Sequence, residues 1–116
     1  MVFYAKDSKI EIRQRPKDGE GEVQFEAFVD KADMPKHIRM FSDMVFKPGC
    51  SIGKHYHNGE SEFYYVVEGE ATVDDNGTTV VLKKGDVSLC PDGCYHSIKN
   101  CSEGMLRVLG VIVTEA

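Results

Sequence analysis

The sequence predicts an all-β protein with little helix. Turn-forming residues recur at short intervals along the chain, at Pro48-Gly49, Asn58-Gly59, Gly69, Asn76-Gly77, Lys84-Gly85, Pro91-Asp92-Gly93 and Glu103-Gly104. The segments between these turns are rich in Val, Ile, Tyr, Phe and Thr, which favour strands. No helical period of apolar residues lasts long enough to predict a major helix. So many short strands in 116 residues indicate a sandwich or a barrel, in which few strand edges stay exposed.

The expected strands follow one another along the whole chain with short connections. In order they are Ile10–Arg13, Glu22–Phe28, Ile38–Phe46, His55–His57, Glu62–Val67, Ala71–Asp74, Thr78–Leu82, Asp86–Cys90, His96–Lys99 and Leu106–Val113. Asn76-Gly77 favours a type I′ turn and therefore predicts a hairpin. A single helical turn is expected near Asp33–Lys36. A chain of this length forms one domain with one hydrophobic core.

The strand expected at Glu62–Val67 is apolar on both sides. If Glu62 faces the interior, Tyr64 and Val66 face it too, because alternate side chains of a strand share a face. The side chains between them are also apolar and face the opposite way. A strand of this kind is covered on both faces, so we expect a partner subunit or the N-terminal segment to lie across it. Of the two, a homodimer is favoured.

Composition and charge exclude several classes of function. The chain has 14 basic and 19 acidic residues and a formal net charge of −5, which argues against nucleic acid as a partner. It has no apolar run of membrane-spanning length and no signal sequence at its N-terminus, so we expect a cytoplasmic protein without a membrane partner. The four cysteines lack CxxC spacing and are expected to be free thiols.

A cluster of metal-binding residue types is the main functional indication. His55 and His57 are one residue apart, and in a strand both imidazoles point to the same side. The following turn residues reverse the chain and bring Glu62 back beside them. With His96, these side chains would be a costly polar cluster inside a barrel unless a cation compensates them. The pattern therefore predicts a site for a divalent metal.

Two stretches of the sequence resemble the conserved motifs of the cupin superfamily. Gly49 through Gly69, GCSIGKHYHNGESEFYYVVEG, is similar to the first motif: a glycine, five residues, HxH, three or four residues, a glutamate, six residues and a glycine. Gly85 through Asn100, GDVSLCPDGCYHSIKN, is similar to the second: a glycine, five residues, PxG, two residues, a histidine, three residues and an asparagine. Every specified position of both motifs is filled.

The resemblance implies a small single-domain cupin, a conical double-stranded β-barrel of jelly-roll type. Its core would be residues 37–116, while residues 1–36 would add strands and a connecting turn that pack on the barrel or on a partner subunit. The resemblance also implies that His55, His57, Glu62 and His96 bind one divalent transition metal. Iron, manganese, nickel, zinc, cobalt and copper all suit imidazole and carboxylate ligands, so the identity of the ion stays open.

Two functions fit this interpretation. The first is a metal-dependent enzyme of dioxygenase, lyase, isomerase or decarboxylase type that acts on a small chelating organic molecule. The second is a non-catalytic module that binds a small ligand or the metal itself, since this fold supports both. Tyr64 and Cys94 are candidates for a substrate pocket, although a core aromatic and a semi-buried loop thiol are the simpler interpretations. Arg39, His37 and Asp43 lie on or beside a strand whose inward face the sequence does not fix, and no catalytic residue is assigned.

Overall fold

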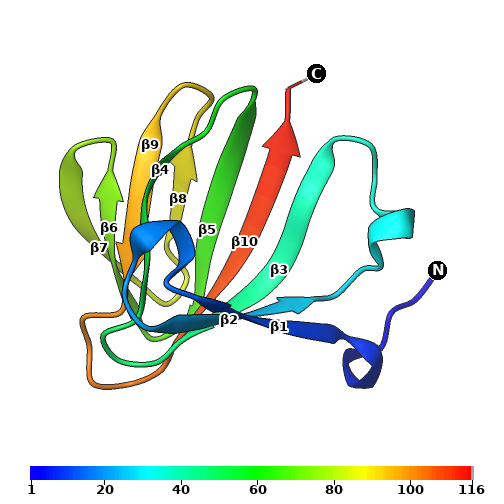
Figure 1. Cartoon of the computed structure of the whole chain (residues 1–116), viewed down its shortest axis with the longest axis horizontal. Helices are drawn as coiled ribbons and strands as arrows, with labels where there is room; N and C mark the ends of the chain where they lie inside the picture. The colour runs from blue at the N-terminus through cyan, green and yellow to red at the C-terminus, as the bar shows by residue number, and fades with distance from the viewer. Residues whose placement is uncertain (116) are drawn as a thin grey trace.

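The computed structural model describes residues 1–115, and Figure 1 shows that strands make up nearly all of its regular structure. The strands are β1 (Lys9–Gln14), β2 (Glu22–Ala27), β3 (Ile38–Phe46), β4 (Ser51–Tyr56), β5 (Glu60–Glu68), β6 (Glu70–Asp75), β7 (Thr78–Lys83), β8 (Val87–Cys90), β9 (Tyr95–Lys99) and β10 (Leu106–Thr114). Three short 3-10 turns join them: η1 (Ala5–Asp7), η2 (Pro16–Asp18) and η3 (Lys31–Asp33). The all-β prediction is confirmed. Within residues 1–115, no helix has the length and apolar character needed to cross a membrane.

The strands form two antiparallel sheets that face each other. One sheet has six strands in the order β1-β2-β3-β10-β5-β8, and the other has four in the order β4-β9-β6-β7. Burial alternates along β10, from Leu106 and Val108 inside to their neighbours outside, as expected for a strand with one face on the core. Val66 and Met44 from the larger sheet and Ile98 from the smaller one are fully buried in the same core.

The N-terminal segment extends the larger sheet. β2 pairs with β3, β1 pairs with β2, and in Figure 1 both run along the edge of the molecule beside β3. This segment therefore does not lie across the outer face of β5, which was one of the two coverings expected from the sequence. Phe63 and Tyr65 on that face are 39% and 44% exposed in the single chain.

The turn between the two halves of the first motif is tighter than predicted. β4 begins at Ser51 and β5 at Glu60, so the strands are longer than the expected His55–His57 and Glu62–Val67. The reversal takes place at Asn58-Gly59, where Gly59 has a φ of 74° that favours glycine. Strand pairing resumes at once, because Glu60 is opposite Thr114 of β10. Glu60 thus lies in a strand, which fixes the direction of its side chain.

Asn100, the last residue of the second motif, forms buried hydrogen bonds that connect two segments of the chain. Its side-chain amide donates to the carbonyl oxygens of Phe46 (2.9 Å) and Gly104 (2.8 Å), and its side-chain oxygen accepts from Ser102. The residue is fully buried, so these bonds satisfy groups that water does not reach. Asn100 is a structural residue at the base of the barrel.

Candidate metal centre

Four side chains from the two sheets converge on one buried point. His55 on β4 is directly opposite His96 on β9, and His57 follows just beyond the end of β4. Glu62 reaches the same point from β5 of the facing sheet. The ligand-type atoms of these four residues all lie within 4.8 Å of one another. Strand alternation and the tight turn after His57 therefore produce the cluster that the motif spacing predicts.

The contacts within the cluster are short. Nε2 of His57 lies 3.0 Å from Oε1 of Glu62 and 3.0 Å from Nε2 of His96. Nε2 of His96 lies 3.0 Å from Nε2 of His55 and 3.0 Å from the same glutamate oxygen. Three imidazole nitrogens and one carboxylate oxygen thus face a common centre, with their side chains 11% exposed or less.

Hydrogen bonds at Nδ1 of two histidines determine that their Nε2 lone pairs point to the common centre. Nδ1 of His55 donates to the Gly53 carbonyl oxygen at 2.7 Å, and Nδ1 of His57 donates to a carboxylate oxygen of Glu60 at 2.7 Å. Both partners only accept, so each Nδ1 carries the proton and each Nε2 presents a lone pair to the centre. Lone pairs that face one another repel unless a cation lies between them. The donor set therefore fits a divalent metal, and such an ion supplies Lewis acidity when bound.

The protonation of the cluster reflects its burial and its close contacts. Burial alone would raise the pKa of Glu62, but the three surrounding imidazoles hold that pKa well below its ordinary range. Burial also opposes protonation of His57, yet the adjacent carboxylates of Glu62 and Glu60 raise its pKa. For His96, burial has the larger effect and lowers the pKa. The carboxylate is thus ionised and available as an anionic ligand at neutral pH.

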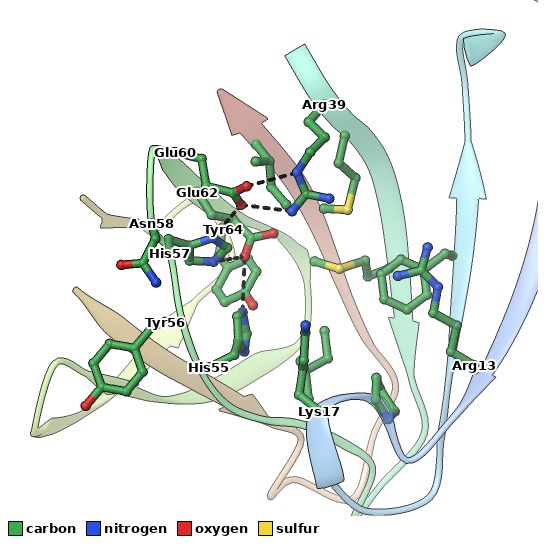
Figure 2. Close-up of a pocket in the computed structure, with 16 residues that line it drawn as sticks. Arg13, Lys17, Arg39, His55, Tyr56, His57, Asn58, Glu60, Glu62 and Tyr64 are labelled. Atoms are coloured by element: carbon green, nitrogen blue, oxygen red, sulfur yellow. Dashed lines mark hydrogen bonds and ion pairs between the residues drawn. The ribbon is translucent and has the colours of Figure 1, made fainter. Parts of the chain in front are cut away.

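Glu60 and Arg39 form a second layer around His57. Arg39 donates from Nε and Nη2 to the two oxygens of Glu60 at 3.0 and 2.8 Å, a bidentate pair that Figure 2 marks with dashed lines. The hydrogen bond from Arg39 holds the pKa of Glu60 below its ordinary value. The ionised carboxylate in turn orients the imidazole of His57. The strand expected at Glu62–Val67 excludes Glu60, and the position of Glu60 three residues after His57 is the signal in the sequence for its role.

Tyr64 lies against the cluster and presents an unsatisfied hydroxyl. Its ring stacks on His96 with centroids 4.5 Å apart and an interplanar angle of 4°. The side chain is 1% exposed, and its hydroxyl has no hydrogen-bond partner within residues 1–115. Burial and the nearby Glu62 charge raise its pKa well above the ordinary value, so the phenol keeps its proton. A buried donor without a partner beside this cluster is available to a ligand.

The other candidates from the sequence lie elsewhere. Cys94 is half-buried and does not line the cavity, although its carbonyl oxygen accepts the His57 backbone N–H at 3.0 Å. His37 is near the surface, with Nδ1 3.4 Å from Oγ1 of Thr114. Asp43 is buried but pairs with Arg107 on the other face of its strand, where Oδ2 lies 2.9 Å from Nη2. Arg39 is the candidate from this group that reaches the cavity.

The cluster opens into a cavity of about 660 Å³, a size typical of small-molecule sites. Figure 2 shows His55, His57 and Glu62 on one side of this space and Arg13 of the N-terminal segment on the other. Phe25 of β2 and Arg13 of β1 line the cavity, as does Lys17 of η2. None of these three residues belongs to either motif, so their position in the cavity was not predictable from the sequence.

Gly53 fixes η2 against the strand that carries His55. A Cβ at Gly53 would collide with the backbone carbonyl oxygen of Lys17, so only glycine allows this approach. We expect Gly53→Ala to destabilise the fold by about 1–3 kcal/mol, the usual cost of overpacking. Urea denaturation measures the loss. Gly104→Ala is the matched control, because a Cβ there meets no atom within 4 Å. Equal stability of the two variants would contradict the close contact.

Comparisons with known proteins agree with this architecture. The cupin domain family matches residues 42–112. An oxalate-binding protein of Thermotoga maritima is 40% identical over 113 residues, which cover 97% of this chain and 93% of that protein. The crystal structure of a predicted oxalate decarboxylase from Thermotoga maritima superposes with a TM-score of 0.92 and 37% identity, covering 98% of this chain and 99% of the other.

More distant structures share the fold alone. The polyketide cyclase RemF of Streptomyces resistomycificus has a TM-score of 0.79 at 21% identity, covering all of this chain and 80% of the other. The family match spans most of the chain and includes all four residues of the buried cluster. The chain belongs to the cupin domain family.

Proposed function

We propose that this chain binds one divalent transition metal through His55, His57, Glu62 and His96 and uses it to bind a small chelating organic acid. The observation that carries the proposal is the convergence of three imidazole nitrogens and one carboxylate oxygen at a buried point. Four protein ligands leave two positions of an octahedral ion open, enough for a bidentate ligand.

The class of ligand follows from the cavity and from the similar proteins. Two oxygen atoms of one small acid can occupy adjacent positions on the ion, and the cavity beside it has room for such an acid. The 40% identical relative is named an oxalate-binding protein, which supports a short carboxylic acid of the oxalate type. The ligand is therefore an oxygen-rich anion.

A second candidate function is catalysis on the same ligand, as a decarboxylase or dioxygenase. The buried hydroxyl of Tyr64, which lacks a partner within residues 1–115, favours it. Such a group can hold a proton near a bound acid, and the raised pKa of Tyr64 keeps that proton in place at neutral pH. The carboxylates of the cavity are less suited to hold this proton, because Glu62 belongs to the cluster and Glu60 is bound by Arg39 and His57.

Isothermal titration of oxalate into metal-loaded and metal-free protein tests the proposed function. We expect binding only to the loaded form, with one oxalate per chain, because the ion supplies the contacts to both oxygens. Equal heats from the two forms would contradict metal-dependent binding. Release of carbon dioxide or consumption of dioxygen in the same samples distinguishes an enzyme from a binding module.

We also propose that two copies of the chain associate through the outer face of β5 and β8. Phe63 lies opposite Leu89 and Tyr65 opposite Val87, and together they form an apolar patch. Their exposed fractions in the single chain run from 39% to 57%. A contiguous apolar patch of this kind is typical of an interface between proteins.

The association predicts a particle of twice the chain mass of 13.0 kDa. Sedimentation equilibrium measures this mass. We expect Leu89→Lys to shift the protein to a monomer, because a charge in the interface loses its hydration. Val81→Lys is the control, since Val81 is 51% exposed on β7 of the other sheet. A monomeric native protein would rule out the dimer.

A further inference from the structure

We infer that Lys17 binds a second anionic group of the ligand, at the end of the ligand distant from the metal site. The inference rests on the proposed function and narrows its ligand class. Lys17 lines the cavity that contains the histidine cluster, and Figure 2 shows its side chain rising from η2 into this space on the side of His55. No motif of the family includes this residue.

Lys17 differs from the other cations of the cavity in having no anionic partner. Arg39 is engaged by Glu60 in a bidentate pair. Arg13 bonds to Glu11, with Nε 3.0 Å from Oε1, and its guanidinium lies 4.0 Å from the ring centroid of Phe25. Within residues 1–115, the ammonium of Lys17 makes no ion pair. Its charge is thus available to an anion inside the cavity.

The backbone around Lys17 is held in an unusual conformation. Arg15, Lys17 and Asp18 have φ values of 45°, 55° and 60°, in the left-handed region that non-glycine residues rarely adopt. Such strain persists only where the surrounding structure imposes it, and it clusters at ligand sites. Here the surrounding structure is β4, because glycines at 19 and 53 let the two backbones approach closely. The fold therefore fixes the Lys17 backbone beside the strand that carries His55.

The position of Lys17 determines which chemical groups the ligand carries at its two ends. One end of the ligand carries two adjacent oxygen donors for the metal, and the opposite end carries a carboxylate for the ammonium. The cavity of about 660 Å³ accepts such a molecule, and a two-carbon acid fills only a small part of it. The inferred class is a chelating dicarboxylic acid longer than oxalate.

A matched pair of probes tests the inference in the metal-loaded protein. 2-Hydroxyglutarate and 2-hydroxypentanoate share the chelating hydroxy acid, but only the first has a distal carboxylate. We expect isothermal titration to show about fivefold tighter binding of 2-hydroxyglutarate, a charge-assisted contact weakened by partial exposure. Lys17→Asn should remove this preference while leaving 2-hydroxypentanoate unchanged, and Lys17→Arg should keep most of it.

The variants are chosen so that the fold survives. Asparagine tolerates the left-handed conformation at this position, and elemental analysis verifies that each variant keeps its metal. Lys54→Gln is the control, because it removes one positive charge from an exposed position on β4 that does not line the cavity.

The possible outcomes separate the inference from the proposed function. A preference for 2-hydroxyglutarate that persists in Lys17→Asn overturns the role of Lys17, as does equal binding of both probes to the native protein. In either case metal-dependent chelation stands. If the metal-loaded native protein binds neither probe nor oxalate, the proposed function and the inference both fail.

Discussion

Replacing His57 with alanine is expected to reduce bound metal from one ion per chain to nearly none. The Nε2 atom of His57 lies 3.0 Å from both Glu62 Oε1 and His96 Nε2, so it is in close contact with two other residues of the cluster. Its loss removes one ligand and leaves the carboxylate of Glu60 without the imidazole that it orients. Elemental analysis of protein purified without a nickel affinity step measures the change.

His37→Ala is the matched control for this experiment. His37 is near the surface, and its ring contacts Thr114 rather than the cluster. Its removal should leave the metal content unchanged. Glu60→Gln should give an intermediate result, with metal affinity reduced by roughly 10- to 100-fold, because it disturbs only the orientation of His57. A full complement of metal in His57→Ala would show that the ion binds somewhere else.

Removing the metal is expected to lower the melting temperature of the native protein. An ion that binds only the folded state adds to the free energy of unfolding by mass action, by about 2.7 kcal/mol at 100 times its Kd. In a domain of this size that corresponds to roughly 10 °C. Differential scanning calorimetry with and without EDTA measures the shift.

The His57→Ala variant separates metal removal from other effects of the chelator. Since this variant has lost the cluster, EDTA should leave its melting temperature unchanged. The apo form should also lose stability, because the Nε2 lone pairs of His55 and His57 and the carboxylate of Glu62 then face one buried point without a cation. An unchanged melting temperature of the native protein in EDTA would contradict a contribution of metal to the stability of the fold.

Local rules were sufficient to predict the fold class and the grouping of His55, His57 and Glu62, while His96 was added by the resemblance to the second cupin motif. Side chains two apart on a strand share a face, which brings His55 and His57 together whatever the rest of the chain does. The turn at Asn58-Gly59 then returns Glu62 to the same side. These relations involve a few consecutive residues, so they are visible in the sequence.

Contacts between distant segments were not predictable in this way. The role of Glu60 depends on Arg39, which lies 21 residues earlier on β3 and whose direction the loose alternation of Ile38–Phe46 did not fix. Lys17 reaches the cavity only because glycines at 19 and 53 let η2 pack on β4. Neither relation has a periodic or motif signal, because each arises when separate parts of the chain pack together.

What covers the outer face of β5 was also not fully predictable from the sequence. The alternation of apolar residues correctly indicated that Phe63 and Tyr65 point away from the core. It did not indicate that the N-terminal segment would extend the sheet beside β3 and leave this face open. The N-terminal strands could either pair with the edge of β3 or pack across the outer face of β5. Contacts between distant segments decide between these arrangements, and the pattern of a single strand does not.

An anomalous-difference map from crystals of zinc-loaded protein locates the bound metal directly. We expect one peak per chain, about 2.0–2.2 Å from Nε2 of each of the three cluster histidines and from a carboxylate oxygen of Glu62. A peak at another place in the chain, or no peak between these four side chains, would contradict this expectation.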